Sequence, residues 1–305
     1  MSQAVILHEV TKRYGRLTAL DRVTFDVAEG ELFGLIGPDG AGKSSLYRIL
    51  ATLCRPDGGH ASVFGRDTVA DYRSLRAIIG YMPQQFSLYQ DMTVGENLNF
   101  FASLFGVQVK ENYDLIAPVF GRLERFSSRR AGALSGGMKQ KLALSCALIH
   151  RPKILFLDEP TTGVDAMSRS EFWDMLSVLR QSGITVLVST SYMDEATRCE
   201  RIALIDKGHI LGIDTPDRLV DRIGENLYSA TATDMFGLLK KLRSMPVVEE
   251  CYTFGASLHV VGGRDFDENR VATELRMSGF ADANISRIRG DIEDLFIKLT
   301  RDGRQ

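Results

Sequence analysis

The glycine-rich stretch from Gly37 to Ser44 combines residue types that bind phosphate groups. It reads Gly-Pro-Asp-Gly-Ala-Gly-Lys-Ser and fits the spacing G-x-x-x-x-G-K-[ST]. Backbone N–H groups can converge on phosphate oxygens there, and a helix N-terminus adds the positive end of its dipole. Lys43 would reach the β- and γ-phosphates, and Ser44 would coordinate Mg²⁺. A plain tight turn is the alternative, but a buried strand before it and a helix after it favour phosphate binding. The predicted nucleotide-binding residues here are Gly37, Pro38, Asp39, Gly40, Ala41, Gly42, Lys43, Ser44 and Ser45.

Two adjacent carboxylates, Asp158 and Glu159, end the apolar run Ile154–Leu157. Ligands of open α/β sheets bind at the carboxyl ends of the strands, so a buried strand here would deliver both carboxylates to that edge. Asp158 is then the candidate Mg²⁺ anchor, directly or through water, and Glu159 the candidate base that polarises an attacking water. Many strands end in acidic residues, so this pattern gains its weight from the phosphate-binding loop.

A second candidate anion site is the stretch Leu-Ser-Gly-Gly-Met-Lys-Gln at residues 134–140. A serine and two glycines lead into a predicted helix, whose start can bind an anion. One nucleotide does not need two such sites, so we expect this one to act in trans, on nucleotide held by another protomer. In isolation, the same letters would indicate a serine N-cap followed by flexible glycines. Its residues are Leu134, Ser135, Gly136, Gly137, Met138, Lys139 and Gln140.

The elements around the phosphate-binding loop read as an α/β unit. Residues 22–27 alternate polar and apolar as a half-exposed strand does, and residues 32–36 form a run typical of a strand buried on both faces. A helix is predicted from Lys43, because the period changes to that of a helix with one buried stripe. That stripe consists of Leu46, Ile49, Leu50 and Leu53.

Further apolar runs predict strands at 154–157, 184–188 and 202–205, with a helix between the first two. Ser168 and Glu171 predict a capping box at the start of that helix. Alternation of strands and helices predicts a largely parallel sheet. Residues 88–150 lack strand signals and predict a helical insertion.

The pattern changes after about residue 220, where we place a domain boundary. Strand and helix candidates then follow in the order β-α-β-β-α-β, which is the split unit of ferredoxin-like domains. A final helix carries an apolar stripe, and no catalytic motif is visible. The strands are expected at 227–231, 247–252, 258–261 and 284–288, and the helices at 234–244 and 267–278.

Composition restricts the class of protein. The 305 residues carry a net charge of -2, so no overall positive charge attracts nucleic acid, and we expect no nucleic-acid partner. The four cysteines are too far apart in the sequence for a zinc site or a disulfide framework, which favours a reducing compartment. Apolar runs are shorter than the ~20 residues that cross a bilayer, and no signal peptide is visible. We therefore expect a cytoplasmic protein or part of a larger one.

Together, the three motifs make the chain resemble the nucleotide-binding domains of ABC (ATP-binding cassette) proteins over about residues 4–220. The resemblance implies ATP and Mg²⁺ as cofactors and a P-loop NTPase fold of ABC type. That fold has a mostly parallel sheet, an antiparallel N-terminal subdomain and a helical subdomain at about 88–150. The expected domains are thus an ABC ATPase domain at 1–220 and a small α+β accessory domain at 221–305.

Three further positions take roles from this resemblance. Tyr14 stands where the family has the aromatic residue that stacks on adenine; an ordinary tyrosine at a strand end is the alternative. Gln84 matches the glutamine that contacts Mg²⁺ and the attacking water and links the helical insertion to a membrane partner. Asp165 matches the loop that crosses between protomers in the dimer.

The sequence departs from the family at two positions. Asp39 replaces the usual asparagine and puts a carboxylate near the polyphosphate, where like charges repel. Ser191 stands where the family has its switch histidine, so it is a candidate catalytic residue that departs from the family pattern. This replacement suggests slow hydrolysis at this chain's own site. None of the five histidines, at positions 8, 60, 150, 209 and 259, has an equivalent context.

Within the family, the chain resembles exporter ATPases of the drug-, polysaccharide- or heme-export type, and more narrowly the first ATPase half of tandem-ATPase multidrug exporters. This implies membrane permease subunits and a second cassette as partners, and a peripheral location on the inner face of the cell membrane. The second cassette would form a homodimer or, as we prefer, a hetero-pair or tandem half. The alternatives are a regulatory subunit that hydrolyses ATP weakly or not at all, and a soluble ABC protein not bound to a membrane. Apolar residues near Gln84 are expected to mix core and docking surface: Phe86, Leu88, Tyr89, Leu98, Phe100, Phe101, Leu104 and Phe105.

Overall fold

The computed structural model describes residues 2–224 and 226–302. The chain divides into two compact units, Met1–Pro216 and Asp217–Gln305. In the described part of the chain, no helix has the length and apolar character needed to cross a membrane.

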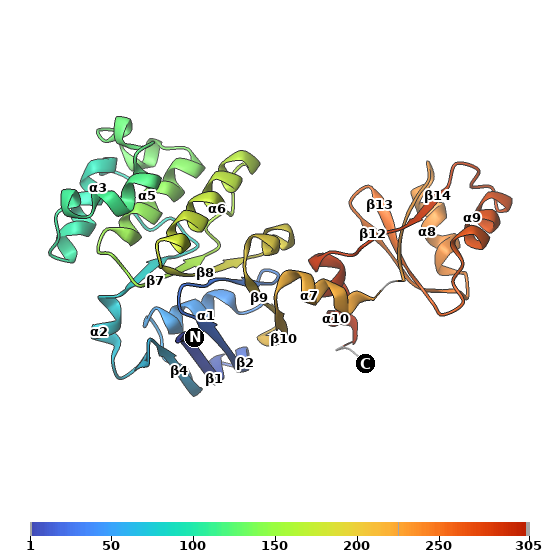
Figure 1. The fold of residues 1–305 in the computed structure, drawn as a ribbon, viewed down its shortest axis with the longest axis horizontal. Coiled ribbons are helices and arrows are strands. Elements are labelled where there is room, and N and C mark those ends of the chain that lie inside the picture. The colour runs from blue at the N-terminus through green and yellow to red at the C-terminus, as the bar shows by residue number, and fades with distance from the viewer. Residues whose placement is uncertain (1, 225, 303–305) are drawn as a thin grey trace. The chain divides into compact units, whose positions relative to one another are not determined.

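A six-stranded sheet forms the centre of the first unit (Figure 1). The strand pairs among β9, β3, β8, β7 and β6 are parallel, whereas β10 pairs antiparallel with β9 at one edge. Every residue of β3, β7 and β8 is buried, which explains the apolar run of β3 and of the first four residues of β7. The polar residues Asp158 of β7 and Ser189 and Thr190 of β8 lie at the carboxyl ends of these strands. In sheet order the strands are β10 (His209–Asp214), β9 (Arg201–Asp206), β3 (Leu32–Ile36), β8 (Thr185–Thr190), β7 (Ile154–Asp158) and β6 (Ile79–Met82).

A second sheet of this unit is fully antiparallel, as the fold class requires of the N-terminal subdomain. Its long strands β1 and β2 alternate buried and exposed residues, and their buried side chains join one core with α1. The order is β2 (Leu17–Ala28), β1 (Gln3–Tyr14), β4 (Gly58–Val63) and β5 (Arg66–Asp67).

The helix after the phosphate-binding loop is shorter than its apolar stripe suggested. Helix α1 spans Lys43–Leu50, and Thr52 then adopts a left-handed φ of 60° that ends the helix. Leu53 consequently leaves the buried face and is 55% exposed. The prediction that Leu53 completes the buried stripe is therefore wrong.

The helical insertion consists of α3, α4 and α5, which pack together through contacts of α5 with both other helices (Figure 1). Thr93 begins α3 with a capping box, in which its side chain and that of Glu96 each accept a backbone N–H. Helix α6 lies against β3 and β8. Besides α1, the α-helices of this unit include α2 (Tyr72–Arg76), α3 (Val94–Leu104), α4 (Tyr113–Phe120), α5 (Gly136–Leu148) and α6 (Ala166–Gln181), and the 3-10 helix η4 (Met193–Arg198) comes after them.

In the second unit, an antiparallel sheet has the order β12-β13-β11-β14. The chain order β11-α8-β12-β13-α9-β14 with this pairing is the split βαβ arrangement of ferredoxin-like domains. Helix α10 is attached by a buried cluster, in which Asp294 Oδ1 accepts from Tyr252 Oη at 2.8 Å and lies 2.6 Å from His259 Nδ1. The elements are α7 (Pro216–Val220), β11 (Leu227–Thr231), α8 (Met235–Arg243), β12 (Val248–Phe254), β13 (Ser257–Gly262), α9 (Glu268–Met277), β14 (Asn284–Arg287) and α10 (Ile292–Asp302).

Candidate nucleotide-binding site

The phosphate-binding loop connects the end of β3 to the start of α1, and its glycines are required by the backbone. Gly40 and Gly42 have φ values of 79° and 108°, which side chains strongly disfavour. A Cβ on Gly42 would lie 2.3 Å from the Ala19 carbonyl oxygen, and one on Gly37 would lie 2.1 Å from the Ile205 carbonyl oxygen. The loop is thus pressed between β2 and β9, with its N–H groups at the start of α1.

The Lys43 ammonium lies within this loop and makes three polar contacts. It donates to the carbonyl oxygens of Gly37 at 2.7 Å and Pro38 at 2.9 Å. It also forms an ion pair with Glu159, with Nζ 2.9 Å from Oε1. Both side chains are buried, so the pair interacts with little screening by solvent.

Asp158, the last residue of β7, is held by two hydroxyl groups. The Ser189 hydroxyl donates to Oδ1 at 2.8 Å, and the Ser44 hydroxyl also bonds the carboxylate. Burial raises the pKa of Asp158 above its usual range, and these two bonds oppose that rise. A serine hydroxyl beside a carboxylate is a set of oxygen donors that suits Mg²⁺.

Glu159 adopts a left-handed φ of 50°, which is uncommon for a residue with a side chain. Its N–H donates to the Ser189 carbonyl oxygen at 3.1 Å and to Ser189 Oγ at 3.0 Å, which holds this backbone in place. Its Oε2 accepts from Gln84 Nε2 at 3.2 Å and from Thr162 Oγ1 at 3.0 Å. The carboxylate is therefore aimed at the Lys43 side of the turn.

The cavity beside these groups measures about 480 Å³. Tyr14, at the end of β1, lines it and is 43% exposed, so part of its ring is open to a ligand. The structure thus brings Tyr14, the phosphate-binding loop, Gln84 and Glu159 to one cavity. Its full lining is Tyr14, Leu17, Thr18, Ala19, Asp39, Gly40, Gly42, Lys43, Ser44, Ser45, Gln84, Glu159 and Lys207.

The stretch Leu134–Gln140 does not line this cavity. Ser135 caps α5 by accepting from the Met138 N–H at 3.4 Å, as its position before the two glycines predicts. A Cβ on Gly137 would lie 2.8 Å from Ser168, so the start of α5 packs closely on the start of α6. The two helix starts therefore form one surface, separate from the cavity in this chain.

Asp165 caps α6 by accepting from the Ser168 N–H at 3.0 Å. The predicted capping box of Ser168 and Glu171 is wrong, because the helix begins at Ala166 and Asp165 supplies the cap. Glu171 instead pairs with Lys141 and Arg122. Sequence reading assigned Asp165 only to the dimer, and its helix-capping role was missed.

Ser191 follows β8 and is partly buried, but it does not line the cavity. No histidine is among the lining residues either. Thr162 and Ser189, which hold the two carboxylates, were not predicted from the sequence. Ser189 had a usable signal, since it lies near the carboxyl end of β8, which is parallel to and adjacent to β7, at the edge where polar residues converge.

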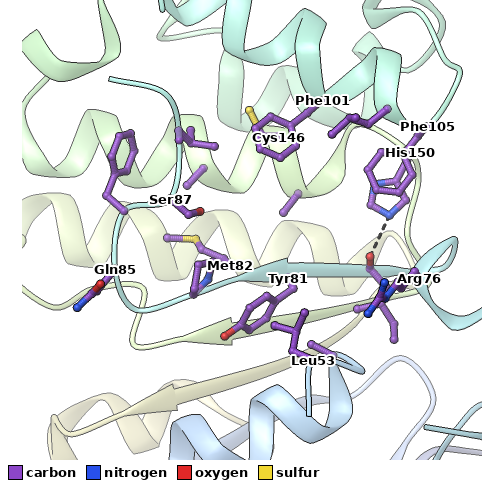
Figure 2. A pocket seen from close by; sticks show the side chains of 18 of the residues that line it. Leu53, Arg76, Tyr81, Met82, Gln85, Ser87, Phe101, Phe105, Cys146 and His150 are labelled. Carbon is purple, nitrogen blue, oxygen red and sulfur yellow. Dashed lines mark hydrogen bonds between the residues drawn. The ribbon is translucent and has the colours of Figure 1, made fainter. Parts of the chain in front are cut away.

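A separate apolar groove of about 630 Å³ lies between the helical insertion and the central sheet. Figure 2 shows Phe101 and Cys146 on one side of it and Tyr81 and Leu53 on the other. Five of the apolar residues that the sequence marked near Gln84 line it, whereas Leu98 belongs to the core. Those five are Phe86, Leu88, Phe101, Leu104 and Phe105.

His150 forms part of the groove wall (Figure 2). Its ring stacks on Phe105 with centroids 3.8 Å apart, and Nε2 lies 3.0 Å from the Ile79 carbonyl oxygen. Burial lowers the pKa of His150, which favours the neutral ring. The groove is therefore predominantly apolar.

Comparison with known proteins gives consistent results. The family model described as ABC transporter matches residues 20–162. The chain is 38% identical over 306 residues to the probable multidrug ABC transporter ATP-binding protein YbhF of Escherichia coli (strain K12), covering 98% of this chain and 52% of YbhF. It thus spans about half the length of that relative. It is 36% identical over 301 residues to the Nod factor export ATP-binding protein I of Mesorhizobium japonicum, covering 97% of this chain and 86% of that protein.

Solved structures agree with this relationship. A structure of an ATP binding subunit of an ABC transporter has 27% identity and a TM-score of 0.66, covering 72% of this chain and 93% of its own. The cassette MJ0796, in a dimeric post-hydrolysis state bound to ADP and Pi, has 29% identity and a TM-score of 0.62, covering 69% of this chain and 98% of its own. The matched portions correspond in extent to the first unit.

Proposed function

Because this chain belongs to the ABC transporter family of ATP-binding proteins, we propose that it hydrolyses ATP to drive export through separate membrane permease subunits. The observation that carries the proposal is the cavity in which Tyr14, Lys43 and Glu159 meet. The names of the multidrug and Nod factor relatives favour export as the direction of transport.

In this function the phosphate-binding loop and Lys43 bind the polyphosphate of ATP, and Tyr14 stacks on adenine. Ser44, Asp158 and Gln84 would hold Mg²⁺, which neutralises charge on the β- and γ-phosphate oxygens when bound. Glu159 accepts a proton from the attacking water, because its carboxylate reaches the Lys43 side of the loop. Asp39 lines the same cavity and reduces its positive charge.

The surface formed by Leu134–Gln140 and Asp165 serves a second cassette. Its position outside this chain's cavity is what an in-trans role requires, since it leaves the N-terminus of α5 available to nucleotide on another protomer. The cassette MJ0796, a relative whose solved structure is dimeric, supports pairing as the working arrangement.

Ser191 favours an unequal pair of sites. A serine is shorter than the family's histidine and cannot share an imidazole proton, so water at this chain's own site is positioned less well. This chain then hydrolyses slowly at its own loop and completes a faster site on a histidine-bearing partner, in a hetero-pair or a tandem. Ser191 is also the observation that favours the second candidate, a regulatory subunit with weak hydrolysis.

The apolar groove is the docking surface for the permease, on the inner face of the cell membrane. Leu104 and Phe105 line it and are 62% and 40% exposed, so part of its wall is uncovered in the chain by itself. The groove and the proposed active site share one short segment of the chain, because Pro83 and Gln85 line the groove while Gln84 between them donates to Glu159. Permease docking at the groove would therefore act next to the proposed Mg²⁺ and water contacts of Gln84.

Site-directed cross-linking in native membranes tests the docking. Cysteine at Leu104 or Phe105 should cross-link to an integral membrane protein, whereas cysteine at Met277, which is exposed on α9, should not. The unsubstituted chain controls for its four native cysteines. Capture of no membrane protein from either groove position would contradict the proposed permease.

A further inference from the structure

A buried carboxylate outside the cavity connects two turns of the proposed active site. Glu195, in η4, is only 5% exposed. Its Oε2 accepts from Thr190 Oγ1 at 2.6 Å and from Thr161 Oγ1 at 3.1 Å. Its Oε1 has no hydrogen-bond partner among the described residues. Burying a carboxylate with one oxygen unbonded lowers the stability of the fold, so a contribution to stability does not account for Glu195 at this position.

The first of these bonds fixes the turn that carries Ser191. Thr190 Oγ1 accepts from the Tyr192 N–H at 3.0 Å, so its own proton is directed to Glu195. The Thr190 carbonyl oxygen accepts from the Gly37 N–H at 3.2 Å. Thr190, directly before Ser191, is therefore held by Glu195 through its side chain and by the phosphate-binding loop through its carbonyl oxygen, and its hydroxyl also holds the Tyr192 N–H directly after Ser191.

The second bond fixes the turn that carries Glu159. Thr161 lies two residues after Glu159 and is fully buried. The adjacent Thr162 donates through its hydroxyl to Glu159 Oε2 at 3.0 Å. A displacement of the turn at Thr161 would therefore move both Thr162 and the carboxylate that it holds.

We propose that Glu195 is a positioning residue for ATP hydrolysis, holding the Glu159 turn and the Ser191 turn in a fixed relation. It does not line the cavity, so its loss should reduce the rate of hydrolysis while leaving ATP affinity unchanged. The role is that of a hydrogen-bond acceptor for two hydroxyl groups, which an amide oxygen can also fill. This inference rests on Glu159 being the proposed base.

The test compares Glu195→Ala, Glu195→Gln and Asp194→Ala, the last being an exposed acidic neighbour on the same short helix. Single-turnover hydrolysis of MgATP and equilibrium ATP binding are measured separately on the full chain. Glu195→Ala should lower the rate about tenfold or more, because small displacements of reacting groups are costly. Glu195→Gln should retain the rate within about threefold by keeping the acceptor, and Asp194→Ala should match the wild type.

Thr161→Val keeps the test decisive if Glu195→Ala does not fold, because valine preserves the β-branched shape and removes only the hydroxyl. It should lower the rate severalfold at unchanged ATP affinity, and Thr161→Ser should restore it. Wild-type rates in folded Glu195→Ala or Thr161→Val would overturn the proposal. So would a loss of ATP affinity that accounts for the change in rate. Glu159→Gln is measured in the same assays. A wild-type rate of hydrolysis in that variant would show that Glu159 is not the base, and this result is independent of the results at Glu195.

Discussion

The Nζ atom of Lys43 lies 2.9 Å from Oε1 of Glu159, and the two side chains are 3% and 4% exposed. The residue proposed to bind phosphate thus contacts the residue proposed to activate water. A polyphosphate competes for the same ammonium, so we expect ATP binding to exchange this ion pair for phosphate contacts and to free the carboxylate for water. Breaking a buried pair without such an exchange leaves an uncompensated charge.

Lys43→Ala should abolish measurable ATP binding, with a loss of affinity on the order of 10²-fold or more, because it removes several charge-assisted hydrogen bonds. Equilibrium binding with a fluorescent ATP analogue measures the loss. Lys207→Gln is the matched control, since Lys207 lines the same cavity but is exposed, and it should change affinity only slightly. Unchanged affinity in Lys43→Ala would remove the phosphate-binding assignment.

Ser191→His should accelerate hydrolysis by the isolated chain without changing ATP affinity. A positioned imidazole can hold the attacking water in line, and such groups typically contribute on the order of 10²–10⁴ in rate. Steady-state ATPase assays of both proteins decide the matter. Fast turnover by the wild type with no gain from histidine would defeat the proposal of unequal sites and favour an ordinary homodimer.

His150 should make the first unit lose stability on acidification. Burial depresses the pKa of His150 in the folded state, so the unfolded chain binds its proton more readily. The stability gained from the neutral ring is fully present above the unfolded pKa, about 6.5, and is lost progressively as the pH falls below that value and through the lower pKa of the folded state. Thermal unfolding between about pH 7.5 and 5.5 should therefore show a smaller acid-induced loss for His150→Gln than for the wild type.

The control for this measurement is His8→Gln, because His8 is exposed in β1 and should keep the wild-type pH dependence. Equal acid sensitivity in all three proteins would show that His150 does not contribute, and would leave the neutral character of the groove wall without support.

Local patterns predicted much of the fold. The spacing around Lys43 and the apolar run before Asp158 identified β3, α1 and β7. Backbone conformations that need glycine, and burial on both faces of a strand, restrict the residue types enough to be recognised in a sequence. The strand β11 was likewise predicted with its observed bounds. Helix ends were less predictable, since Leu53 continued the stripe although Thr52 ends α1.

The contacts that complete the site depend on pairings far apart in the sequence. Glu195 meets Thr161, 34 residues away, only because β7 and β8 are adjacent in the sheet. Gln84 meets Glu159 across 75 residues for a comparable reason. The residue types indicate what chemistry these side chains can perform. Predicting which residues they contact requires the order of strands in the sheet, which no local sequence pattern specifies.

The most direct test of the account is hydrolysis by Glu159→Gln, compared with the wild type in single-turnover assays with MgATP. The amide keeps the shape of the side chain but cannot accept the proton of water, so the rate should fall on the order of 10²–10⁴. ATP binding should remain, or become tighter, because Lys43 is released from its ion pair. An unimpaired rate of hydrolysis in a folded Glu159→Gln protein would contradict the assignment of this cavity as a Glu159-dependent ATPase site.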